Sequence, residues 1–161
     1  MTTASLIGLV PPPFEAPATR GHGFDSVAER GTILVLYFYP KDNTPGCSDE
    51  SAQFVALAGE FEKAGARIYG ISRDSVRSHE SFRAKYSMPF DLISDADERL
   101  CQLFDVIRDK QMYGRTVRGI ERSTFVLDRS GAVRAEWRRV KVPGHAQQVL
   151  AEVLALGDSV G

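Results

Sequence analysis

The chain has 161 residues, with 20 Lys plus Arg against 21 Asp plus Glu, and its formal net charge is −1. This length suits one domain with its own core, so we expect residues 1–161 to form a single domain. The near-neutral charge argues against a polybasic nucleic-acid binder or membrane anchor. Two cysteines are too few for a disulfide scaffold or for a site built from three or four thiolates.

The N-terminal segment, residues 1–13, lacks the basic start and the long apolar run of a signal peptide. No apolar stretch in the sequence approaches the length of about 18 residues that a membrane-spanning helix needs. We therefore expect a cytoplasmic protein with no membrane partner.

Strand and helix patterns alternate along most of the chain. Residues 14–30, punctuated by glycine, read as irregular chain or a short hairpin. The uniformly apolar run Ile33–Tyr39 predicts a buried central strand. The remaining predictions are a helix over 46–64, a strand over 67–71, a helix over 76–86, a strand over 90–93, a helix over 95–104, strands over 123–127 and 132–140, and a helix over 145–156.

This order predicts an α/β protein. Strand–helix alternation favours parallel pairing, and the turn sequence over 128–131 adds an antiparallel hairpin near the end of the chain. We expect a mixed central sheet with helices on both faces, and the thioredoxin-like fold is one member of that class.

Cys47 lies at the start of the first predicted helix, directly after a turn rich in Pro, Asn and Gly. Free backbone N–H groups and the positive end of the helix dipole favour the thiolate there, and the thiolate is the nucleophile. Thr44 can point its hydroxyl at the sulfur or at an oxygen bound beside it, and Pro40 can shield the thiolate. The alternative is a buried structural cysteine, a common role, which the flanking residues disfavour.

The spacing Pro40-x-x-x-Thr44-x-x-Cys47 resembles the active-site motif of the peroxiredoxins. The longer string over 37–47 is similar to the bacterioferritin comigratory protein, or peroxiredoxin Q, subgroup in particular. Further similar segments lie at 90–95, 112–114, 119–125 and 137–145. The resemblance covers about residues 30–155 and implies a thioredoxin-like fold.

The resemblance also implies a thiol-dependent peroxidase that reduces hydrogen peroxide and organic hydroperoxides. The Cys47 thiolate would attack the terminal peroxide oxygen and become a sulfenic acid. Thr44 would orient the peroxide, and Arg122 would stabilise the thiolate and the developing negative oxygen. Backbone N–H groups near Gly46 would add donors, and Glu50 would orient local groups such as Arg122. No metal, haem, flavin or other cofactor is expected.

The sulfenic acid must then be reduced. The subgroup's usual resolving cysteines correspond here to Ala52 and Arg83, so both positions lack a thiol. Cys101 is the remaining candidate for a resolving residue, but its apolar helical surroundings favour a packing role. We therefore expect a one-Cys cycle completed by an external thiol from thioredoxin, glutaredoxin or a small molecule.

Two other functions remain open. The empty resolving positions also suit a peroxide-responsive redox sensor or interaction protein with slow turnover. The segment 115–141 carries eight basic and three acidic residues, which could bind an acidic partner or nucleic acid. Solvated strand edges are the favoured interpretation, and we expect no nucleic-acid partner, because aromatic residues do not alternate regularly with the basic ones.

The remaining features point away from other site types. The three histidines, His22, His79 and His145, lack metal-ligand spacing, so we expect no metal site. There is no C-x-x-C motif for thioredoxin-type disulfide exchange. The subgroup resemblance favours a monomer over larger assemblies.

Overall fold

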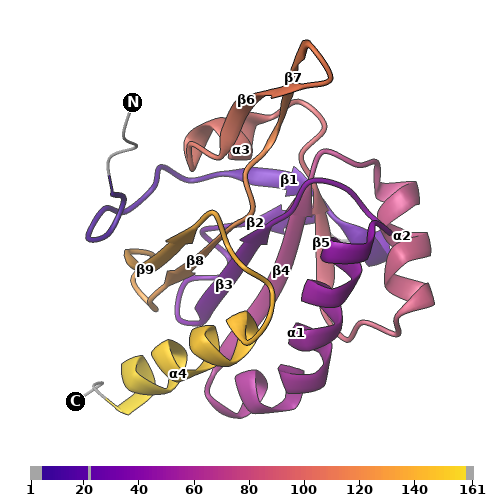
Figure 1. The fold of residues 1–161 in the computed structure, drawn as a ribbon. Helices are drawn as coiled ribbons and strands as arrows, with labels where there is room; N and C mark the ends of the chain where they lie inside the picture. Colours follow the sequence, from indigo (N-terminus) through magenta and orange to yellow (C-terminus); the bar gives the residue numbers. More distant parts are fainter. Residues whose placement is uncertain (1–4, 22, 159–161) are drawn as a thin grey trace.

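The computed structural model describes residues 5–21 and 23–158, and it is built around a five-stranded sheet (Figure 1). Its elements, in chain order, are β1 (Glu15–Pro17), η1 (Thr19–Gly21), β2 (Gly23–Asp25), β3 (Ile33–Phe38), α1 (Pro45–Lys63), β4 (Ala66–Ser72), α2 (Val76–Lys85), β5 (Asp91–Ser94), α3 (Arg99–Leu103), β6 (Ile107–Met112), β7 (Arg115–Ile120), β8 (Ser123–Leu127), β9 (Val133–Arg138) and α4 (His145–Asp158).

The strand order in the main sheet is β5-β4-β3-β8-β9. Strand β3 pairs in parallel with β4, which pairs in parallel with β5. On its other side β3 pairs antiparallel with β8, and β9 returns antiparallel beside β8. The sheet is therefore mixed, with parallel pairing where helices connect the strands, and the prediction of this topology is confirmed.

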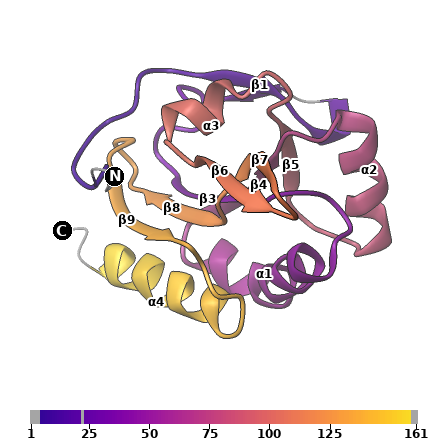
Figure 2. The same ribbon diagram turned by 45° about the horizontal axis from the view of Figure 1, so that its top comes forward.

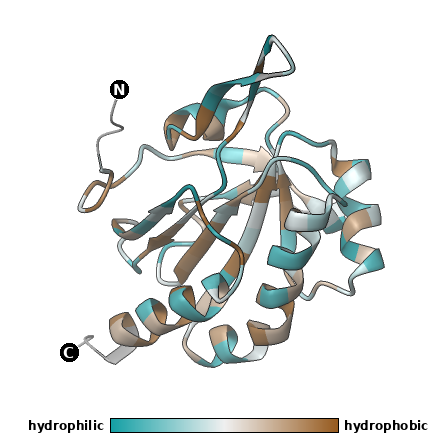
Figure 3. Cartoon of the chain, in the orientation of Figure 1, coloured by the Kyte–Doolittle hydropathy of each residue, from teal (hydrophilic) through white to brown (hydrophobic). Residues whose placement is uncertain are grey.

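Strand β3 is buried along its whole length and divides the core into two layers. Its side chains alternate between them: Val35 and Tyr37 belong to one cluster, Leu36 and Phe38 to the other. Helices α1 and α4 cover the first face, whereas α3 and the β1–β2 hairpin cover the second (Figure 2). Apolar residues are concentrated on the strands and polar residues on the outer sides of the helices (Figure 3). The prediction of helices on both faces is confirmed.

The predicted helix over 95–104 is too long at its N-terminal end, because α3 starts only at Arg99. The carboxylate of Asp95 accepts the backbone N–H groups of Leu100 and Cys101 at 3.0 and 2.8 Å. Glu98 has a left-handed backbone with φ 63°. The chain before Arg99 is therefore a turn held by a side chain rather than a helical turn.

The sequence pattern predicts no element over residues 105–122, whereas the structure has the antiparallel β6–β7 hairpin there. It projects from the body of the molecule (Figure 1). Most of β7 is exposed, and Tyr113 at the tip is 98% exposed. Tyr113 and Gly114 both have positive φ, which is the backbone of a tight hairpin turn. The short hairpin allowed for residues 14–30 is present as β1–β2.

Among the helices that the structure describes, none is both long enough and apolar enough to cross a membrane.

Candidate active site

Cys47 lies in the first turn of α1, beyond the C-terminal end of the central strand β3. Pro45 begins the helix, a position where its missing N–H costs nothing, and Thr44 is the N-cap. The Cys47 side chain is only 1% exposed and packs in the same core cluster as Tyr37 and Phe54. The thiol is therefore at a helix N-terminus, as predicted, and it is also nearly shielded from solvent.

Arg122 comes from the link between β7 and β8 and reaches the same place. Its Nη2 lies 3.4 Å from the sulfur of Cys47, and its Nη1 lies 2.6 Å from Oε1 of Glu50. The backbone carbonyl of Arg122 accepts the N–H of Val140 at 3.0 Å, which fixes its main chain against the segment after β9. The structure thus brings Cys47, Glu50 and Arg122 together as predicted.

The charges at this site are strongly coupled. Burial alone would lower the pKa of Arg122, but the negative charges of Glu50 and Cys47 outweigh it, and the pKa is raised. Burial raises the pKa of Glu50 to about 7, although Arg122 pulls it down. The second oxygen, Oε2, is buried without a hydrogen-bond partner among the described residues. Arg122 is therefore the fixed charge at the sulfur, and Glu50 is the group that can change protonation near neutral pH.

Gly46 gives the guanidinium room. A Cβ at this position would lie 3.1 Å from Nη2 of Arg122, closer than an ordinary van der Waals contact. The absence of a side chain here therefore lets the arginine approach the sulfur.

We expect Gly46→Ala to push the guanidinium away from Cys47 and to slow the reaction of the thiol with peroxide by about tenfold, since it weakens one charged hydrogen bond. Single-turnover oxidation of Cys47 measures this rate. Gly59→Ala, at a helical position on α1 where a Cβ meets nothing within 4 Å, is the matched control and should leave the rate unchanged.

The hydroxyl of Thr44 does not cap the helix. It donates to the carbonyl oxygen of Lys41 at 2.9 Å, so its proton is engaged with that carbonyl, and its orientation toward the sulfur or a bound oxygen stays a prediction. Its oxygen lone pairs remain available to accept a hydrogen bond from a peroxide O–H. Pro40 lies directly after β3 and is exposed, and its shielding role stays a prediction.

Cys101 lies on the other side of the sheet. Its thiol is fully buried in the second core cluster, with Phe38 and Phe104, whereas Cys47 belongs to the first cluster. Burial raises the pKa of Cys101 well above its ordinary value, and the adjacent Asp95 raises it further. A bond between the two cysteines would require the chain to cross the sheet, so this geometry opposes a resolving role for Cys101.

The two positions that lack a resolving thiol have different surroundings. Ala52 is exposed on α1. Arg83 is half-buried on α2, and its Nε donates to the backbone carbonyl of Phe90 at 3.0 Å. Arg83 therefore anchors α2 to the chain before β5.

Sequence reasoning missed the part played by His79. It is fully buried, and its Nδ1 lies 2.8 and 3.0 Å from the two carboxylate oxygens of Asp42. With Asp74 the two residues place three potential metal ligands within 4.8 Å of one another. Their atoms already bond to one another and to neighbouring hydroxyl and backbone groups, so the cluster is satisfied as a hydrogen-bond network. His22 lies outside the described residues.

His145 also looks isolated in the sequence but has partners in the structure. Its Nε2 lies 2.7 Å from the hydroxyl of Thr124 on β8, and its ring meets Trp137 edge-on at 5.6 Å. Burial lowers the pKa of His145 to about 4, and the positive charge of Arg122 acts in the same direction. The ring is therefore neutral at physiological pH and packs behind the site.

This pKa predicts an acid sensitivity. The ordinary value of 6.5 applies to the unfolded chain. Between pH 6.5 and 4 the unfolded chain binds a proton here that the folded chain does not, so folding stability from this group falls as the pH falls. We expect the melting temperature of His145→Gln minus that of the unaltered protein to become more positive as the pH is lowered from about 7 to about 4.5. Thermal unfolding across that range checks it, and parallel curves for the two proteins would contradict it.

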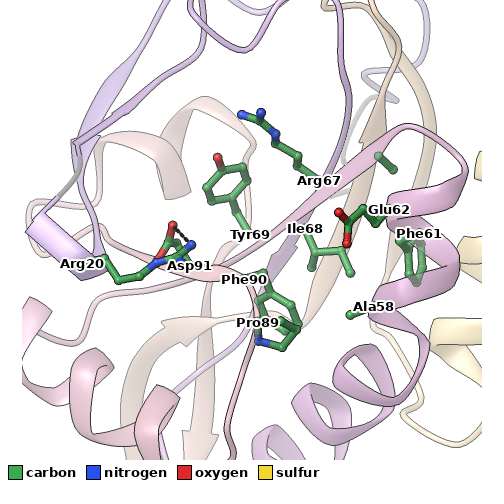
Figure 4. A pocket seen from close by; sticks show the side chains of 11 residues that line it. Arg20, Ala58, Phe61, Glu62, Arg67, Ile68, Tyr69, Pro89, Phe90 and Asp91 are labelled. Carbon is green, nitrogen blue, oxygen red and sulfur yellow. Dashed lines mark hydrogen bonds and ion pairs between the residues drawn. The ribbon is translucent and has the colours of Figure 1, made fainter.

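A cavity of about 300 Å³ lies elsewhere, between the C-terminal half of α1 and the starting ends of β4 and β5 (Figure 4). Phe61, Ile68 and Phe90 form its apolar wall, and the Arg20–Asp91 ion pair, at 2.7 Å, lies at its rim. It contains neither cysteine and lies at the opposite end of the parallel strands from Cys47. The reactive thiol is therefore not part of this cavity.

The chain is similar to known proteins over most of its length. Residues 7–136 match the model of the AhpC/TSA family. Peroxiredoxin Bcp of Xanthomonas campestris is 52% identical over 155 residues, which cover 95% of this chain and 97% of the relative. A solved structure of a Xylella fastidiosa PrxQ mutant, 43% identical, matches with a TM-score of 0.91 over 96% of this chain and 98% of its own.

A second solved structure, of the Xanthomonas campestris bacterioferritin comigratory protein, was studied for alkyl peroxide reduction. It matches with a TM-score of 0.86 and 52% identity, over 89% of this chain and 92% of its own. These likenesses extend over nearly the whole described chain and include the thioredoxin-like fold. The chain belongs to the AhpC/TSA family, and within it to the Bcp or peroxiredoxin Q group of peroxiredoxins.

Proposed function

We propose that this peroxiredoxin reduces hydrogen peroxide and organic hydroperoxides through Cys47 in a one-Cys cycle. The observation that carries the proposal is the contact between Nη2 of Arg122 and the sulfur of Cys47, at 3.4 Å, at the N-terminus of α1. A guanidinium stays charged at any physiological pH and can stabilise both a thiolate and a developing oxyanion.

In the first step the Cys47 thiolate attacks the terminal oxygen of the hydroperoxide. A sulfur–oxygen bond forms and the O–O bond breaks, so the sulfur loses two electrons and becomes a sulfenic acid. The peroxide gains these electrons and leaves, with a proton, as water or an alcohol. Thr44 accepts a hydrogen bond from the bound peroxide, and Arg122 donates to the oxygen on which negative charge develops. None of these roles needs a metal or an organic cofactor.

In the second step an external thiol attacks the sulfenic sulfur and releases water, which leaves a mixed disulfide on Cys47. A second thiol then frees Cys47 and carries away the disulfide. Members of this family take electrons from thiol reductants such as thioredoxin, and glutaredoxin and small thiols are the other candidates. The burial of Cys101 and the residues at positions 52 and 83 support an external reductant. We further propose a single-domain monomer that works in the cytoplasm, with no nucleic-acid partner.

Intact-mass measurement after one equivalent of hydroperoxide tests the one-Cys cycle. With a thiol-blocking reagent added afterwards, we expect a mass gain of one oxygen at Cys47 and a blocked Cys101 after denaturation. A loss of two hydrogens with neither thiol blocked would show a Cys47–Cys101 disulfide and contradict the proposal.

The second candidate function, a peroxide sensor with slow turnover, is favoured by the same empty resolving positions. It predicts that one equivalent of peroxide is consumed and that neither thioredoxin nor glutaredoxin restores the thiol. Sustained peroxide consumption with either reductant would exclude it.

A further inference from the structure

We propose that the buried Asp42–His79 pair positions the peroxidatic loop, which we define as residues 39–44 between β3 and α1. The two side chains act through Thr44 rather than by touching the sulfur. They restrain the Lys41–Asp42 peptide, whose carbonyl oxygen accepts the hydrogen bond of the Thr44 hydroxyl. In this way they orient the Thr44 oxygen that would contact a hydroperoxide. The inference rests on the proposed function in one respect, because it requires Cys47 to react with peroxide.

His79 ties the loop to two other elements. It lies on α2, and its Nε2 is 2.9 Å from the carbonyl oxygen of Ile93 on β5. Its Nδ1 faces both carboxylate oxygens of Asp42. Both ring nitrogens are therefore engaged, and the ring is held between the loop and the sheet.

Asp42 is held in one orientation by groups on every side. Besides His79, its carboxylate accepts the hydroxyl of Tyr39 at 2.6 Å and the hydroxyl of Ser78 at 2.8 Å. Its backbone N–H donates to the carboxylate of Asp74 at 2.9 Å. The side chain of Asp42 is therefore anchored mainly by α2, and its main chain by Asp74, which lies just before the N-cap residue of that helix.

The anchored main chain reaches Thr44 directly. The N–H of Asp42 and the C=O of Lys41 belong to one peptide group, which is planar. That C=O accepts the Thr44 hydroxyl at 2.9 Å. Rotation of this peptide would break the hydrogen bond from the Thr44 hydroxyl to Lys41. The hydroxyl could then rotate, and its oxygen lone pairs would leave their present direction. Because the carboxylate and this peptide N–H belong to the same residue, the Asp42–His79 contact, between residues 37 positions apart, also restrains a group three residues from the reactive cysteine.

The test compares Asp42→Ala with Asp42→Asn in single-turnover oxidation of Cys47, followed by rapid quenching and trapping of the sulfenic acid. We expect Asp42→Ala to lower the second-order rate constant for hydrogen peroxide about 100-fold, because small misplacements of catalytic groups have effects of that size. Asp42→Asn should stay within about tenfold, since its amide can still bond Tyr39 and His79. The rate of alkylation by iodoacetamide, which needs a thiolate but no oriented peroxide, should change less than about threefold in both.

A double-mutant cycle asks whether the effect passes through Thr44. In a Thr44→Ala background we expect Asp42→Ala to change the peroxide rate by less than about threefold, because the group that it positions is already gone. An equal loss with and without Thr44 would overturn the proposal.

Ser75→Ala is the matched control for general weakening of α2. It removes the hydroxyl that accepts the N–H of Ser78 at 3.1 Å and caps the helix, and Ser75 makes no part of the loop. The peroxide rate should be unchanged. Ser78→Ala removes one donor to Asp42 and should lower the rate about threefold to tenfold, which tests the idea in a folded protein even where Asp42→Ala does not fold.

The proposal fails if Asp42→Ala, folded, oxidises as fast as the unaltered protein, if Ser78→Ala leaves the rate unchanged, or if Ser75→Ala slows the reaction as much as Ser78→Ala. Failure of the proposed function would look different, because the unaltered protein would then form no sulfenic acid at Cys47.

Discussion

Cys47→Ser is expected to abolish peroxide consumption, leaving only the rate of the uncatalysed reaction. A serine hydroxyl is protonated at neutral pH and cannot be oxidised to an analogue of sulfenic acid, so neither the nucleophile nor the intermediate can form. The measurement is the disappearance of hydrogen peroxide with dithiothreitol as reductant. A variant that keeps thiol-dependent turnover would place the chemistry elsewhere in the chain.

Cys101→Ala is the matched control, because it removes the other thiol. We expect it to keep the peroxidase rate within about threefold, since the thiol packs in the second core cluster on the far side of the sheet. Its stability should fall modestly as a small cavity opens. If Cys101→Ala stopped turnover after one equivalent of peroxide, the second thiol would have a redox role that its burial gives no reason to expect.

The local part of this site could be predicted from the sequence. An apolar strand followed by a turn and a helix start fixes the environment of Cys47, because the free N–H groups at a helix N-terminus follow from helix geometry alone. The residues that join it over long distances could not be derived in this way. Arg122 is separated from Cys47 by 75 positions, and the resemblance to peroxiredoxins, rather than any local rule, identified it.

Two features escaped prediction for physical reasons. The β6–β7 hairpin is exposed and rich in charged side chains, so it lacks the apolar alternation by which strands are found in sequence. Gly114 was its available signal, since a two-residue hairpin turn needs positive φ angles, which glycine adopts readily. In the sequence His79 looks isolated because its partner, Asp42, lies 37 positions away in the loop after β3. Only the pairing of β3, β4 and β5 brings the two together.

Arg122→Ala is expected to lower the rate of Cys47 oxidation by about 10²- to 10³-fold, the usual effect of losing one donor to a developing oxyanion. Arg122→Lys should recover little of this. A lysine ammonium cannot place separate donors on the sulfur and on Glu50, which the two guanidinium nitrogens do at 3.4 and 2.6 Å. Stopped-flow measurement of Cys47 oxidation in a single turnover, with excess hydrogen peroxide, gives the rate.

Loss of Arg122 also leaves Glu50 buried without its ion-pair partner, and that effect must be separated from catalysis. The pKa of Glu50, already raised to about 7 by burial, should rise further once the guanidinium is gone, so the carboxyl takes up a proton rather than remaining as an unpaired charge. Glu50→Gln, alone and with Arg122→Ala, isolates this contribution. If Glu50→Gln lowers the rate far less than Arg122→Ala does, the guanidinium acts on the reacting atoms themselves. Equal losses would instead mean that Arg122 serves mainly to hold Glu50, and the oxyanion donor would have to come from the backbone of α1.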